Sequence, residues 1–201
     1  VDEKTMVVIS SYSGNTEETL SSLQEAQARK AQIFILTSGG KLAEYAHKHN
    51  LPSYVFSPEN NPSAQPRMGL GYNILSIVAL LARCRQIHGV ENLNELPDFL
   101  RRKQSESNGI LKMAKTLVEK IPVLVASEHL KGAAHAIKNQ LNENAKSFAC
   151  LFDLPELNHH LLEGLTFPKS NSDNLAFVFM TSDKYHSELK MRYTLTRAAV
   201  R

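Results

Sequence analysis

The chain has 201 residues, of which 42% are apolar and 21% charged, an ordinary balance for a globular protein of one domain or two small ones. Its net charge of +3 is mild and no run of Lys and Arg forms a polybasic patch, so composition gives no case for a nucleic-acid partner. No apolar run approaches membrane-spanning length and no signal peptide is recognisable. We therefore expect a cytoplasmic protein with no membrane partner.

The first part of the chain alternates apolar, strand-like runs with helical patterns. Strands are predicted over 6–10, 32–37 and 54–58, and helices over 16–30 and 39–50. Residues 67–89 form a long and strongly apolar helix, which we expect to be buried on most of its surface. Strands that alternate with helices indicate a parallel sheet with helices on both faces.

A second cycle follows a polar segment, 91–108, which has no clear apolar stripe and predicts a linker. Strands are then predicted over 121–127, 147–152 and 175–182, with helices over 110–120, 128–146, 157–165 and 184–200. Both halves repeat the order strand, small polar turn, helix, so two related α/β units are predicted, at 1–90 and 109–201. The chain opens almost at a strand and stops in a helix, so we expect a piece of a longer protein with both units incomplete.

Cysteine usage is sparse. Cys84 and Cys150 are isolated, lie in apolar contexts and have neither CxxC nor metal-ligand spacing. We expect both to be buried free thiols in a reducing compartment, and we expect no metal site.

The segment SYSGNTEET (11–19) leaves the first strand and enters a helix at once. Hydroxyl side chains and a flexible Gly14 precede the free amides of a helix N-terminus, a combination suited to binding an anion. A simpler interpretation is that Thr16 or Asn15 only caps the helix, with acidic residues in its first turn complementing the dipole. The position at the carboxyl end of a strand favours a ligand site, because open α/β sheets bind ligands there.

Several segments resemble one enzyme family. SSYSGNTEETL (10–20) resembles the phosphosugar-binding signature of sugar isomerase (SIS) domains. PRMGLGYN (66–73), NENAK (142–146) and PELNHH (155–160) are similar, in family order, to segments of the bifunctional phosphoglucose/phosphomannose isomerases. The resemblance implies two SIS-type, doubly wound (flavodoxin-like) units with parallel sheets.

The resemblance also implies roles for particular residues. The groups that would hold the sugar phosphate are the hydroxyls and loop amides of Ser11, Ser13, Gly14, Asn15 and Thr16. Arg67 would lie near the substrate and Glu143 would be the catalytic base. His159 would assist ring opening from the partner subunit of a homodimer with shared active sites. The family pattern usually reads NHN where this chain reads NHH, so His159 and His160 both stay candidates for the imidazole that faces the sugar.

The implied reaction interconverts glucose 6-phosphate, and with it mannose 6-phosphate, with fructose 6-phosphate. It proceeds by proton transfer through a cis-enediol and requires neither a metal nor a redox cofactor. The family's glycine-rich phosphate loop and its catalytic lysine have no match here, so activity is expected of the parent enzyme rather than of this piece. The alternatives are a non-catalytic sugar-phosphate-binding or regulatory SIS module and, against the NENAK and ELNHH matches, hexosamine-forming amidotransferase chemistry.

Overall fold

The computed structural model describes residues 1–105 and 108–200. The chain divides into two compact units, Val1–Leu96 and Pro97–Arg201. Each unit is built on its own three-stranded sheet, in which every neighbouring pair of strands is parallel. The prediction of an α/β fold with parallel sheets is therefore confirmed. The domain limits proposed from the sequence, 1–90 and 109–201, stay a prediction.

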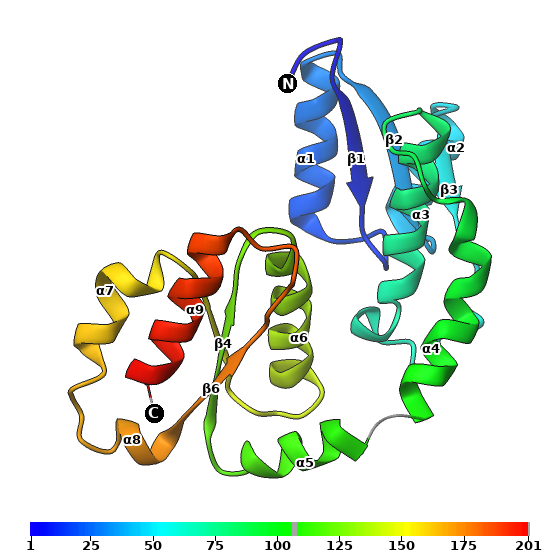
Figure 1. The fold of residues 1–201 in the computed structure, drawn as a ribbon. Helices are drawn as coiled ribbons and strands as arrows, with labels where there is room; N and C mark the ends of the chain where they lie inside the picture. The colour runs from blue at the N-terminus through cyan, green and yellow to red at the C-terminus, as the bar shows by residue number, and fades with distance from the viewer. Residues whose placement is uncertain (106–107, 201) are drawn as a thin grey trace. The chain divides into compact units, whose positions relative to one another are not determined.

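The first unit is a simple alternation of strands and helices (Figure 1). Its elements are β1 (Met6–Ser10), α1 (Glu17–Ala28), β2 (Gln32–Thr37), α2 (Gly40–Lys48), β3 (Ser53–Val55), η1 (Pro66–Met68), α3 (Leu70–Arg83) and η2 (Glu91–Glu95). The strand order β1-β2-β3 follows the chain, so both crossovers run in the same direction along the sheet. β1 and β2 occupy the residues predicted for them, since each is an uninterrupted apolar run bounded by polar turns.

The two faces of the first sheet differ. Side chains alternate along a strand, so one set points toward α1 and α2 and forms the core of the unit. This core contains Ile9, Ile33 and Ile35 from the strands with Leu23 of α1 and Leu42 of α2. The opposite face carries a different set of side chains and is bordered by α3.

Helix α3 departs from its sequence prediction. It was expected to extend over 67–89 and to be mostly buried, but the helix covers Leu70–Arg83 and none of its residues is buried. Leu70, Ile74 and Leu75 are at least 40% exposed. Periodicity and apolar content predict the helix itself, whereas burial depends on which other elements pack against it.

The second unit has a different strand order (Figure 1). Its elements are α4 (Leu96–Ser105), α5 (Asn108–Thr116), β4 (Ile121–Ala126), η3 (Glu128–Leu130), α6 (Lys131–Glu143), β5 (Cys150–Asp153), α7 (Leu157–Gly164), α8 (Asn171–Asn174), β6 (Leu175–Phe179) and α9 (Ser187–Ala199). β4 is central in the order β5-β4-β6. Helix α6 lies on one side of this sheet, and α7 and α9 lie on the other, as in a doubly wound fold.

Two further expectations from the sequence differ from the structure. The polar segment 91–108 contains η2 and α4, so composition alone missed a helix there. The prediction that both cysteines are buried is wrong, because Cys84 is exposed and Cys150 is only half-buried. Within the described residues, no helix has both the length and the apolar content needed to span a membrane.

Candidate active site

The loop after β1 is organised by its own hydroxyl groups. Ser11 is 7% exposed, and its Oγ accepts a hydrogen bond from the Gly14 amide at 3.2 Å. The same Oγ lies 2.7 Å from Thr16 Oγ1, where either atom can donate. Thr16 is the N-cap residue of α1, but its side chain does not cap the helix. Ser13 and Thr16 are exposed, so the loop presents two hydroxyls to solvent. Ser11 is buried, and its hydrogen bonds stabilise the loop from inside.

Asn15 has a structural role that the sequence did not reveal. Its Oδ1 accepts a hydrogen bond from the backbone amide of Lys41 at 3.1 Å, in the first turn of α2. Asn15 is therefore not the cap of α1, where a cap was predicted; its side chain instead binds the first turn of α2. The Asn15 amide donates to Ser13 Oγ at 3.3 Å, which fixes that side chain relative to the loop.

The loop after β2 supports the loop after β1. Ser38 donates from both its backbone amide and its hydroxyl to the Tyr12 carbonyl, at 3.0 and 2.6 Å. Two glycines then allow close contact: a Cβ on Gly14 would lie 1.9 Å from the Gly39 carbonyl oxygen, and one on Gly40 would lie 2.4 Å from the Ser13 carbonyl oxygen. The polar TSGG run after the second strand was the available sequence signal for this support.

We expect Gly14→Ala to destabilise the first unit by about 3 kcal/mol or more. Gly14 has a φ of +71°, which costs an L-residue about 1–2 kcal/mol. The added Cβ also meets a backbone oxygen, which no rotamer change can move. Urea unfolding of the full-length protein measures the loss. The control is Gly71→Ala, whose Cβ would have no neighbour within 4 Å; a Gly14→Ala loss below about 1 kcal/mol contradicts the prediction.

Arg67 lies in η1, in the same unit as the loop, and is half-buried. Its Nη1 donates to Gln65 Oε1 at 3.1 Å. The segment around it is connected to the Ser11–Thr16 loop through the side chain of Tyr12, a residue that sequence reasoning did not single out.

Glu143 is the last residue of α6 and is exposed. Asn142 beside it bonds in both directions to the backbone of Ala149, at 3.3 and 3.1 Å, and so holds the turn that leads into β5. In the NENAK motif, the Asn142 side chain therefore stabilises the turn, and the Glu143 carboxylate is exposed. A helix C-terminus by itself disfavours negative charge, so the helix dipole does not account for a carboxylate at this position.

His159 lies in the first turn of α7, which follows the end of β5, and is exposed. Glu143 lies at the opposite edge of the same sheet, because α6 ends where β5 is about to begin. The four residues of β5 span about 13 Å at a rise of about 3.3 Å per residue. Within one chain, the second unit thus keeps Glu143 and His159 apart.

The two adjacent histidines differ in their surroundings. His160 Nε2 lies 3.9 Å from Glu156 Oε1, and its ring centroid is 6.2 Å from that of Phe152. Among the described residues, none forms a hydrogen bond or ion pair with the His159 side chain. His159 is therefore the more available imidazole of the pair.

The second unit does not repeat the hydroxyl loop at its own central strand. Ser127, at the exit of β4, is 1% exposed and donates from its Oγ to the Leu154 carbonyl at 2.7 Å. Tyr193 and Tyr185 bond to the same serine and fill the space beside it. Burial raises the pKa of Tyr193 above its ordinary value, which keeps this hydroxyl neutral. The corresponding edge of the second sheet is therefore closed by its own side chains.

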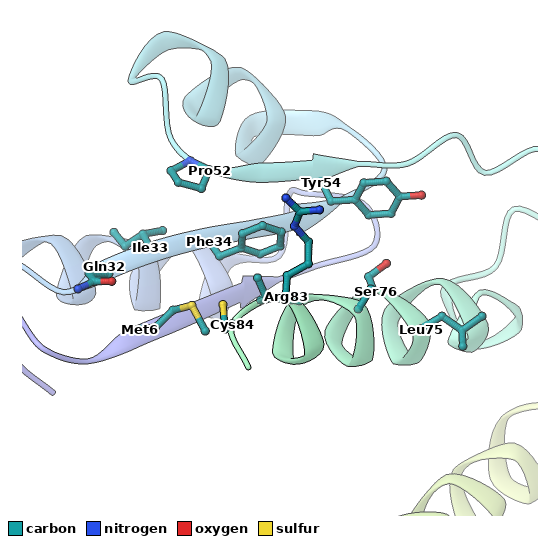
Figure 2. A pocket seen from close by; sticks show the side chains of 12 residues that line it. Met6, Gln32, Ile33, Phe34, Pro52, Tyr54, Leu75, Ser76, Arg83 and Cys84 are labelled. Atoms are coloured by element: carbon teal, nitrogen blue, oxygen red, sulfur yellow. The ribbon is translucent and has the colours of Figure 1, made fainter. Parts of the chain in front are cut away.

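A pocket of about 670 Å³ lies in the first unit between the sheet and α3 (Figure 2). Its lining is mainly apolar and includes Met6, Phe34 and Leu75. None of the predicted site residues lines it. Met6 and Gln32 are the first residues of their strands, whereas the hydroxyl loop follows the end of β1. This pocket is therefore distinct from the candidate sugar-phosphate site. Over residues 1–105 and 108–200, no group of His, Cys, Asp and Glu side chains is placed to hold a metal ion.

Comparison with solved structures identifies the fold. A candidate phosphosugar isomerase from Bacillus subtilis superposes with a TM-score of 0.65 at 18% identity, covering 98% of this chain and 60% of that one. The C-terminal domain of a Francisella tularensis glucosamine-fructose-6-phosphate aminotransferase gives 0.61 at 14% identity, covering 96% and 55%. At these identities the likeness concerns the fold alone.

Sequence comparison is more specific. The family model described as the bacterial phospho-glucose isomerase C-terminal SIS domain matches residues 106–201. Bifunctional phosphoglucose/phosphomannose isomerases from Caldicellulosiruptor bescii and Aquifex aeolicus are 34% and 33% identical and match 100% and 98% of this chain. A D-glucosamine-6-phosphate 4-epimerase from Sulfolobus acidocaldarius is 32% identical over 92% of the chain.

The chain spans about 60% of the length of these curated relatives, with 61%, 59% and 58% covered. The match nevertheless extends through both units, and the segments that resemble the family lie in both. The chain therefore belongs to the family of bifunctional phosphoglucose/phosphomannose isomerases built from SIS domains.

Proposed function

We propose that the full-length protein is an aldose–ketose isomerase that interconverts glucose 6-phosphate and mannose 6-phosphate with fructose 6-phosphate. The observation that carries the proposal is the loop after β1. Its exposed hydroxyls, Ser13 and Thr16, stand at the N-terminus of the twelve-residue helix α1. Curated relatives named as phosphoglucose/phosphomannose isomerases supply the reaction class.

The hydrogen bonds of the loop suggest how it binds a phosphate. Ser11 Oγ already accepts from the Gly14 amide. If Ser11 gives its one hydrogen to Thr16 Oγ1, the Thr16 hydrogen is free to donate outward. The first intrahelical bond of α1 runs from the Leu20 amide to the Thr16 carbonyl oxygen, which leaves the backbone amides of the first turn, 17–19, available to an anion. Phosphate binding then fixes the sugar without using the groups that do chemistry.

The chemical step is a proton transfer. Glu143 takes the proton from C2 of the open-chain aldose, which leaves a cis-enediolate, and returns it to C1 while the O2 hydroxyl proton passes to O1, so that the ketose forms. A displayed carboxylate at the end of α6 suits this role because it is reachable from solvent. His159 assists ring opening, for which an imidazole is well suited because its ring nitrogens can donate or accept a proton. Arg67 binds the substrate, and no redox or metal chemistry is assigned to the reaction.

The separation of Glu143 and His159 supports an active site shared between subunits. The two residues lie at opposite edges of one sheet, so a single copy of the second unit does not present both to one sugar. A homodimer in which His159 comes from the partner subunit removes this difficulty.

The proposal is tested by a coupled assay of the full-length protein with glucose 6-phosphate and mannose 6-phosphate in parallel. We expect turnover of both to fructose 6-phosphate. Glucosamine 6-phosphate is assayed beside them, because one relative is named as an epimerase of that sugar. Turnover of glucosamine 6-phosphate alone would replace isomerase with epimerase, and binding of all three without turnover would favour the regulatory module.

A further inference from the structure

We propose that Tyr12 is a positioning residue that holds Arg67 in a fixed place relative to the phosphate-binding loop. This inference rests on the proposed function, which uses the loop and Arg67 on one substrate. Tyr12 lies between the two serines of the loop, and its side chain is half-buried.

The backbone of Tyr12 belongs to the rigid part of the loop. Its carbonyl oxygen accepts hydrogen bonds from the Ser38 amide and hydroxyl at 3.0 and 2.6 Å. The Oγ1 of Thr37, a fully buried residue, lies 3.5 Å from the same carbonyl oxygen. The main chain of Tyr12 is thus held at the exit of β2, so the point from which its side chain extends is fixed.

The hydroxyl of Tyr12 reaches the residues that precede Arg67. Asn61, which is 5% exposed, donates one hydrogen from Nδ2 to the Tyr12 hydroxyl at 2.8 Å. The other hydrogen goes to the carbonyl oxygen of Gln65, also at 2.8 Å. One buried amide group therefore connects Tyr12 to a residue two positions before Arg67.

The ring of Tyr12 reaches the residues that follow Arg67. A Cβ on Gly69 would lie 2.3 Å from Tyr12 Cε2, so the ring packs directly on the glycine backbone. The ring also meets Phe56 edge-on at 5.5 Å between centroids, and Phe56 is 3% exposed. The aromatic contact keeps the ring from turning away from Gly69.

The residues before and after Arg67 are therefore both held by one side chain, that of Tyr12. Moving Tyr12 shifts the segment on both sides of Arg67, whereas the hydroxyl loop keeps its own bonds to the exit of β2. A variant at Tyr12 is expected to misplace Arg67 more than the loop. Sugar phosphate, which needs both, should lose affinity, and inorganic phosphate, which needs only the loop, should not.

The first experiment is Tyr12→Phe in the full-length protein, which removes the bond from Asn61 and keeps the ring. We expect KM for fructose 6-phosphate to rise about fivefold, and the inhibition constant of inorganic phosphate to change less than about twofold. The matched control is Tyr45→Phe, which also loses a hydroxyl that accepts a side-chain amide hydrogen, from Gln27. Equal rises in both constants, or no rise in KM, would overturn the inference.

The second experiment measures coupling with Gly69. Gly69 has φ −95° and ψ 17°, a backbone that alanine can adopt, so Gly69→Ala acts mainly through the clash with the ring. We expect it to lower kcat/KM about tenfold in the wild-type background and less than about twofold in a Tyr12→Ala background. Equal losses in the two backgrounds would show that Tyr12 does not transmit the effect.

A third readout needs no catalysis. Trypsin cleaves after arginine when the chain opens locally, so the rate of cleavage between Arg67 and Met68 reports how firmly η1 is held. We expect faster cleavage in Tyr12→Phe than in wild type and no change in Tyr45→Phe. If wild type has no isomerase turnover, the proposed function fails, while this rate still decides the positioning role; an unchanged rate in Tyr12→Phe rejects it.

Discussion

Glu143→Gln in the full-length protein is expected to lower kcat for isomerisation about 10³-fold, within the range of about 10²–10⁴ for a general base. KM should change by less than about threefold, because the amide has the same shape and the phosphate is bound elsewhere. The substitution removes the group that accepts the C2 proton and leaves the loop after β1 intact. Steady-state kinetics with glucose 6-phosphate and fructose 6-phosphate measure both constants.

Folding stability separates a chemical defect from a structural one. Glu143 is exposed at the end of α6, so the neutral amide should change the free energy of unfolding by less than about 0.5 kcal/mol. Glu163→Gln, an exposed substitution of the same kind on α7, is the matched control and should retain wild-type kcat. If Glu143→Gln keeps kcat within about tenfold of wild type, another residue is the base.

Most of the fold can be predicted from the sequence because its strands are continuous apolar runs. β1 and β2 coincide with their predicted residues, as buried parallel strands bounded by polar turns do most readily. Helix α4 is not predicted although Leu96, Phe99 and Leu100 stand at helical spacing, because the stripe is short and the surrounding segment, 91–108, is polar overall. The lack of buried residues on α3 was equally out of reach, because burial depends on neighbouring elements and not on the helix's own composition.

The residues of the candidate site can be predicted from the sequence, but the separate role of each residue cannot. The sequence predicts one shared role for the hydroxyls after β1, yet Ser11 is buried inside the loop while Ser13 and Thr16 are exposed. Asn15 accepts a hydrogen bond from the backbone amide of Lys41, 26 positions away along the chain, a contact that no local pattern encodes. Tyr12 was passed over because its partners, Asn61 and Gly69, become neighbours only through the folded sheet.

Mixing two inactive variants should restore activity if active sites are shared. Glu143→Gln and His159→Gln are each expected to lose nearly all turnover as homodimers. In a mixed dimer, one site combines both damaged residues and the other combines an intact Glu143 with an intact His159 of the partner. Random exchange makes half of the dimers mixed, so recovery of about a quarter of wild-type activity is expected.

The size of this recovery decides where His159 acts. If one chain supplied both residues to its own site, every site in the mixture would contain a defect, and activity would stay at the level of the separate variants. The geometry argues against that case, because β5 separates the end of α6 from the start of α7 within the second unit. Co-refolding equal amounts of the two variants and measuring turnover gives the result. His160→Gln mixed with Glu143→Gln is the control: if His159 is the functional imidazole, the His160→Gln homodimer is active before mixing.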